Sequence, residues 1–184
     1  MPTQLEESVA LLSRALDQTG DVLAAVDRRQ LADTTPCPDW DVATLAAHVV
    51  NAPRNFVARM RGEEPDWSAP SPELPTDWVA AFRSSADDLR HAWHRADPST
   101  PPWTVDWQTA EFTIHTWDLA RATGQSTELD PEVGQRALEL MTASLKPEHR
   151  GAAEAGFVFG EEVAVPEDAA VYDRLAAFAG RDPL

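Results

Sequence analysis

Two side chains that commonly bind metal ions, Glu111 and His115, lie four residues apart in the segment WQTAEFTIHTWDLARATG, residues 107–124. On a helix, this spacing makes them neighbours on one face, with β-carbons about 5–6 Å apart. Ile114 and Ala122 share the same stripe, so the carboxylate and the imidazole are predicted to point toward an apolar core. A carboxylate is rarely buried unless it is paired or bound to a cation. This segment is therefore the first candidate for a functional site.

A third side chain of this kind, His48, is predicted on the buried face of an earlier helix, over residues 42–61. Two histidines and one carboxylate, with a fourth position left for water or substrate, are a recurrent ligand set of catalytic zinc sites. The same donors also suit nickel or iron. The sequence thus predicts one divalent metal ion, with zinc favoured, bound by His48, Glu111 and His115.

Roles without a metal stay open for the same residues. A histidine on an apolar face is often a hydrogen-bonded core residue, which is the alternative for His48. A buried ion pair is the alternative for Glu111 and His115. The spacing differs from HExxH, where an acid between two ligands acts as general base, and the paired Glu-x-x-His of di-iron bundles is missing. If a metal binds, a mononuclear site is predicted.

Several polar residues follow these ligands along the two helices. Asp118, one turn beyond His115, is a candidate to orient that ligand or to accept a proton. Its alternative role is an ion pair with Arg121. Asn51 and Asn55 follow His48 by one and two turns, and with Arg121 they could line a pocket beside the site.

The other reactive side chains are expected outside the site. His91 and His94 lie off the apolar stripe of their helix and should face solvent, and His149 follows a proline and should lie in a loop. Cys37, the only cysteine, precedes the second helix without an evident histidine partner, so a local structural role is expected. The tryptophans near the ligand helices are expected to pack there and to exclude water: Trp40, Trp107 and Trp117.

The elements that must position these residues are predicted from apolar residues repeating at steps of three and four. Helices are expected over 4–27, 42–61, 77–96, 107–124, 130–145 and about 166–180, with Asp39 or Asp41 capping the second. Gly20 should weaken or bend the first helix. The proline-rich segment 62–76 predicts a long crossover loop, and the FVF and VAV pieces within 157–165 could pair as a small extended clip.

These elements predict an all-α fold in a single domain over 1–184. It should comprise a four-helix bundle over about 4–124 and two short additional helices in a C-terminal extension over about 130–184.

Composition narrows the class of partner. Acidic residues outnumber basic ones 31 to 15, giving a formal charge of −16, which disfavours nucleic acid and anionic membrane surfaces. No apolar run approaches the roughly 18 residues of a membrane span, and the N-terminus lacks the pattern of a signal peptide. We therefore expect a cytoplasmic protein, monomeric or homodimeric, whose partners are small molecules.

Three blocks of the sequence together resemble a known family: TPCPDWDVATLAAHVV at 35–50, EFTIHTWDLARATG at 111–124 and FGEEVAVPEDAAVYDRLAAFAGRDP at 159–183. They are similar to actinobacterial metal-binding proteins related to the N-terminal domain of mycothiol-dependent maleylpyruvate isomerase, in the DinB-like superfamily that includes YfiT-type hydrolases. The resemblance implies a four-helix bundle that holds one divalent ion, usually zinc or nickel, through His48, Glu111 and His115. It also implies that the protein acts together with the low-molecular-weight thiol mycothiol, whose sulfur the metal can hold as thiolate.

The isomerase carries a further domain where this chain has short helices, so we expect the fold and the site to carry over better than the reaction. The leading hypothesis is a metal-dependent enzyme that activates a low-molecular-weight thiol, mycothiol, for transfer to or isomerisation of a small electrophile. One alternative is a hydrolase that uses metal-bound water. Another is a non-catalytic module in which a metal only joins two helices.

Overall fold

The computed structural model describes residues 1–37, 40–67, 69–152, 155 and 158–183. Within these residues it contains two short 3₁₀ helices, two isolated β-bridges and no strand. The α-helices are α1 (Gln4–Ala24), α2 (Val42–Met60), α3 (Trp78–His94), α4 (Trp103–Ala122), α5 (Pro131–Ser144) and α6 (Val171–Phe178). The predicted all-α fold is confirmed.

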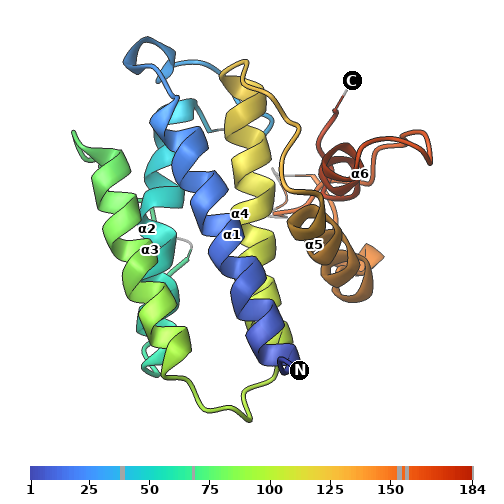
Figure 1. Ribbon diagram of the computed structural model, residues 1–184. Coiled ribbons are helices and arrows are strands. Elements are labelled where there is room, and N and C mark those ends of the chain that lie inside the picture. Colours follow the sequence, from blue (N-terminus) through green and yellow to red (C-terminus); the bar gives the residue numbers. More distant parts are fainter. Residues whose placement is uncertain (38–39, 68, 153–154, 156–157, 184) are drawn as a thin grey trace.

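The first four helices form the bundle, in which α1 packs along α4 and α2 packs along α3 (Figure 1). Helices α1 and α4 run in one direction and α2 and α3 in the other. Because α2 and α3 are parallel, the segment 61–77 must return along the length of the bundle before α3 begins. This segment is the predicted crossover loop.

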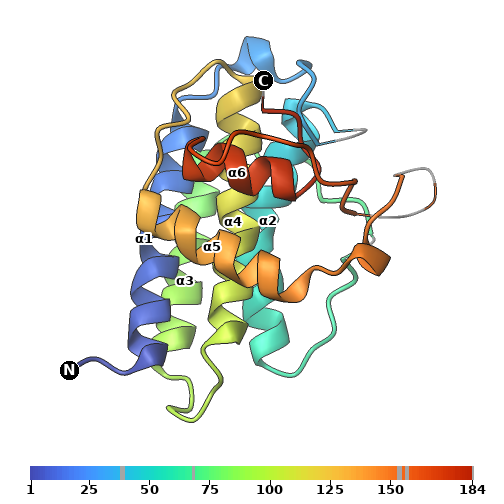
Figure 2. The same ribbon diagram turned by 90° about the vertical axis from the view of Figure 1, so that its right-hand side faces the viewer.

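Helix α4 is covered on both sides, by α1 and α2 within the bundle and by α5 and α6, which lie across its outer side (Figure 2). Nearly all of its residues from Val105 to Ala120 are buried. Its buried threonines are satisfied locally, since Thr113 donates to the Thr109 carbonyl at 2.6 Å. A helix enclosed in this way needs no single apolar stripe, and polar side chains point from it in both directions. Neither α4 nor any other described helix has the length and apolarity of a membrane span.

Three element boundaries depend on local capping. Asp41 caps α2 by accepting the Thr44 amide at 2.8 Å, whereas Asp39 lies outside the described residues. Helix α4 begins at Trp103 rather than Trp107, because two prolines, at 101 and 102, preset the backbone of its first turn. Helix α6 begins at Val171, because the chain from 166 closes a turn and then becomes extended at residue 170.

The expected clip between the FVF and VAV pieces is wrong for the residues that the structure describes, which exclude Phe157. Phe159 instead forms an isolated bridge with Arg150. The Val163 amide donates to the Ala177 carbonyl at 3.0 Å. Among the described residues, the two pieces therefore pair with Arg150 and with Ala177 of α6, and not with each other.

Two helical glycines differ in the space beside them, and α1 runs unbroken through Gly20. A β-carbon on Gly20 would lie 3.6 Å from its nearest neighbour, whereas one on Gly134 would lie 2.8 Å from the Tyr172 ring. We expect Gly20→Ala to raise the free energy of unfolding by up to about 1 kcal/mol, because alanine favours the helix. Gly134→Ala should lower it by about 1–3 kcal/mol through overpacking. Urea unfolding of the pair checks this, and equal stability of the two variants would contradict it.

Candidate metal centre

The structure brings together the three predicted ligands, His48 from α2 and Glu111 and His115 from α4. The Nε2 atom of His48 lies 2.6 Å from Oε1 of Glu111, and Nε2 of His115 lies 3.5 Å from the same oxygen. One ligand atom from each side chain falls within 4.8 Å of the others. The side chains of His48 and Glu111 are 16% and 30% exposed, so the cluster opens toward solvent on the carboxylate side.

The hydrogen-bond direction at His115 shows that these residues fit a cation. Its Nδ1 lies 3.1 Å from a carboxylate oxygen of Asp118, which only accepts, so Nδ1 carries the proton of the neutral imidazole. The neutral ring then turns its Nε2 lone pair toward the Glu111 carboxylate. Two acceptors facing one another need either a second proton on the ring or a cation between them. The donor set of two imidazoles and one carboxylate is suited to a divalent ion.

Asp118 is fully buried, and it pairs with Arg181 instead of the predicted Arg121. The Arg181 guanidinium donates from Nη2 to Oδ2 at 3.1 Å and from Nε to Oδ1 at 3.3 Å. Its Nη1 donates to the Ala179 carbonyl at 3.0 Å. Arg121 is exposed in the last turn of α4. The Asp118 carboxylate therefore orients His115, and the buried Arg181 guanidinium neutralises the charge of that carboxylate.

Opposing influences set the protonation of the two carboxylates. Burial would raise the pKa of Glu111, but the charge of a protonated His115, the hydrogen bond and charge of a protonated His48, and the Arg181 guanidinium lower it below its ordinary value. Burial would likewise raise the pKa of Asp118, yet Arg181 and His115 keep it low. Both groups are therefore anionic at neutral pH.

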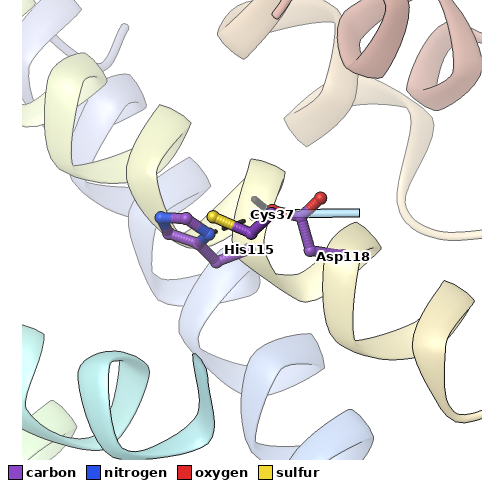
Figure 3. Close-up of side chains that lie close together, drawn as sticks. All are labelled: Cys37, His115 and Asp118. Carbon is purple, nitrogen blue, oxygen red and sulfur yellow. Dashed lines mark hydrogen bonds and ion pairs between the residues drawn. The ribbon is translucent and has the colours of Figure 1, made fainter. Parts of the chain in front are cut away.

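The expectation that Cys37 has no histidine partner is wrong. The Cys37 side chain lies beside those of His115 and Asp118 (Figure 3), with its sulfur within 4.8 Å of their ligand atoms. Nη2 of Arg181 lies 4.0 Å from the same sulfur. These side chains form a second group with metal-binding donors. A cation there would meet the Arg181 guanidinium, which already neutralises Asp118. We therefore assign the candidate ion to the group on the Glu111 side of His115.

The predicted tryptophans divide among three places. Trp40 covers the candidate ligands, with its ring centroid 4.8 Å from that of His48 and 5.9 Å from that of His115. Trp117 is buried on the opposite side of α4 and donates to Asp173 at 3.4 Å. Trp107 is 37% exposed and lies one turn before Glu111 on α4, so its role in excluding water from the site stays a prediction.

The remaining predicted pocket residues lie near the ligands without touching them. Asn51 and Asn55 are half-buried on α2 and form a 3.4 Å hydrogen bond to each other. The other histidines are exposed and stand outside the cluster, as predicted: His91, His94 and His149.

Arg181 was missed by reasoning from spacing, because it lies 63 residues beyond Asp118. The available signal was its place in the third block of the sequence that resembles the metal-binding family.

The Asp118–Arg181 pair predicts a large stability effect. Arg181→Met should lower the free energy of unfolding by about 3–5 kcal/mol at pH 7, because it leaves a buried carboxylate without its cation. Arg121→Met, the control on the exposed face, should change it by no more than about 0.5 kcal/mol. Since the folded-state pKa of Asp118 is lowered, the stability from this pair is present above the ordinary aspartate pKa, about 4, and is lost as pH falls below it. Urea unfolding at pH 7 and pH 3 should therefore show a smaller Arg181→Met penalty in acid, and a constant penalty would contradict the assignment.

Known proteins match this chain over the helices that carry the candidate ligands. Residues 12–120 match the family described as the mycothiol maleylpyruvate isomerase N-terminal domain. Two proteins of Mycobacterium tuberculosis, from strains CDC 1551 and H37Rv and described as uncharacterized, are each 34% identical over 182 aligned residues. Each alignment covers 91% of this chain and 94% of the relative. No solved structure gives a significant match. The chain belongs to the family of the mycothiol maleylpyruvate isomerase N-terminal domain.

Proposed function

We propose that this protein is a metal-dependent enzyme in which His48, Glu111 and His115 hold one divalent ion, zinc by preference, with nickel or iron as alternatives. The observation that carries the proposal is the orientation of His115, whose Nε2 faces the Glu111 carboxylate while Nδ1 faces that of Asp118. When the ring is neutral with its proton on Nδ1, a cation between Nε2 and the Glu111 carboxylate satisfies both acceptors. The family is named after a mycothiol maleylpyruvate isomerase, which supports a low-molecular-weight thiol, mycothiol, as the cosubstrate.

Each surrounding residue has a defined part in this proposal. Asp118 accepts a hydrogen bond from Nδ1–H of His115, which fixes the tautomer and leaves Nε2 to face the ion. Arg181 holds Asp118 in place and keeps it anionic. Trp40 covers both imidazole rings and excludes water from that side. Glu111 leaves its side open, so the cosubstrate approaches from there.

A bound divalent ion would supply one chemical change, a lower pKa for a coordinated thiol, so that the nucleophilic thiolate is present at neutral pH. That thiolate sulfur would form a bond to an electrophilic carbon in one of two ways. It would displace a leaving group such as halide, which departs as the anion, or it would add reversibly across a double bond, whose geometry can change before the thiolate leaves again. The partly exposed Glu111 side chain favours this interpretation over a purely structural metal, because a structural site closes its coordination sphere.

The metal assignment and the chemistry are tested on the same purified protein. We expect about one zinc per chain by mass spectrometry after loading, none in His115→Ala, and undiminished zinc in the exposed control His94→Ala. With mycothiol and 1-chloro-2,4-dinitrobenzene, the zinc-loaded protein should accelerate conjugation, and His115→Ala should lose at least about 100-fold of the rate.

Three results would contradict the proposal in different ways. Stoichiometric zinc in His115→Ala would refute the ligand set. Hydrolysis of 4-nitrophenyl acetate without any thiol-dependent reaction would favour the hydrolase alternative. Bound zinc with neither activity and no thermal stabilisation by mycothiol would favour a non-catalytic module.

A further inference from the structure

A hollow of about 1050 Å³ lies where α2 ends and α4 begins, with α3 and the crossover segment completing its walls. Its lining includes Trp67, Trp103 and Trp107, which are 39%, 56% and 37% exposed. These are the exposed tryptophans of the described residues, and all of them border this hollow. Phe56 forms part of the same wall, with its ring centroid 5.0 Å from that of Trp67. Aromatic faces gathered around one concavity are typical of small-molecule sites.

Three arginines, Arg59, Arg61 and Arg95, line the same hollow. Among the residues that the structure describes, no ion pair or side-chain hydrogen bond engages these guanidinium groups. Elsewhere, six arginines each pair with a carboxylate: Arg14, Arg29, Arg83, Arg90, Arg136 and Arg181. Among the described residues Arg54, Arg121 and Arg174 also lack an ion pair, but they do not line the hollow. The three guanidinium groups of the hollow are distinguished by their position around one concavity. They provide a positive site for a planar anion.

The hollow also contains two carboxylates, which limit the charge that it can accept. Asp97 is engaged locally, since it accepts hydrogen bonds from the amide and the hydroxyl of Ser99 at 2.8 and 2.7 Å. Asp88 is exposed on α3. Three guanidiniums against two carboxylates leave room for one negative charge. A singly charged ligand therefore fits better than a polyanion.

The hollow begins one helical turn from the candidate metal ligands. Trp107 precedes Glu111 by four residues on α4, a distance of about 6 Å along the helix axis. On the α2 side, Phe56 contacts Phe112, the neighbour of Glu111, with ring centroids 5.8 Å apart. A ligand of two fused rings lying along this wall would bring its far end toward the open side of the centre.

We infer that this hollow binds a small aromatic monocarboxylate, with its ring against the tryptophans and its carboxylate paired with the arginines. The inference deepens the proposed function, because it names the substrate class: an aromatic monocarboxylate whose carboxylate anchors it and which carries a separate electrophilic carbon. It depends on the proposed function only for the claim that the bound ligand reacts at the metal centre. Binding itself depends on residues that are separate from the ligand set.

Calorimetric titration with 2-naphthoate, on metal-free and zinc-loaded protein, tests the inference. We expect saturable binding to both forms, and binding of neutral 2-naphthamide that is weaker by at least about tenfold. Arg59→Gln/Arg95→Gln should weaken naphthoate by about tenfold or more while leaving naphthamide nearly unchanged. Trp107→Leu should weaken both ligands. Arg54→Gln, an exposed arginine of α2 outside the hollow, is the matched control and should bind like the wild type.

Urea unfolding of each variant verifies that the fold is retained, which is expected because the substituted side chains are exposed. No saturable binding, equal affinity for naphthoate and naphthamide, or naphthoate binding unchanged in the arginine variant would each overturn the inference. Thiol chemistry at the metal without naphthoate binding would overturn the inference alone. Naphthoate binding by a protein that takes up none of zinc, nickel or iron would overturn the proposed function and leave the inference standing.

Discussion

A buried chain of charges, from Glu111 through His115 and Asp118 to Arg181, is the constraint on which the rest of the structure depends. A carboxylate with no exposed surface, such as Asp118, is stable only when a cation and hydrogen bonds replace the lost water. That cation comes from the far end of the chain, 63 residues later. The intervening chain therefore has to return across α4, which it does through α5 and α6 (Figure 2). The C-terminal extension is thus part of the site and not an appendage to the bundle.

This constraint also explains why α4 is buried almost all round. Its bundle side presents Glu111 and His115 to His48 on α2, while its other side presents Asp118 to Arg181. The imidazole of His115 connects the two sides, with one nitrogen toward each carboxylate. An ordered His115 therefore needs both the bundle and the extension, and the family match over residues 12–120 covers only the first of these.

Helical periodicity was sufficient to predict the bundle and to place His48, Glu111 and His115 on facing surfaces, because those residues follow the apolar stripes of long helices. It was insufficient for Arg181 and Cys37. Both lie outside the predicted helical stripes, and their positions depend on how loops return to α4, which spacing along the chain does not encode. The partial exposure of Trp107 was likewise beyond the sequence: apolar character predicts packing, but the hollow formed by α2, α3 and the crossover segment leaves its ring partly exposed. These contacts can be identified only from the three-dimensional structure.

The central claim is that a divalent ion lies between His48, Glu111 and His115, and anomalous X-ray scattering at the zinc edge, from crystals of the zinc-loaded protein, tests it most directly. We expect one strong peak about 2.0–2.2 Å from Nε2 of His48, Nε2 of His115 and a carboxylate oxygen of Glu111. The Asp118 oxygens should then lie on the Nδ1 side of His115, outside the coordination sphere. A peak bonded to Cys37 and Asp118, or no peak at any of these residues, would contradict the account.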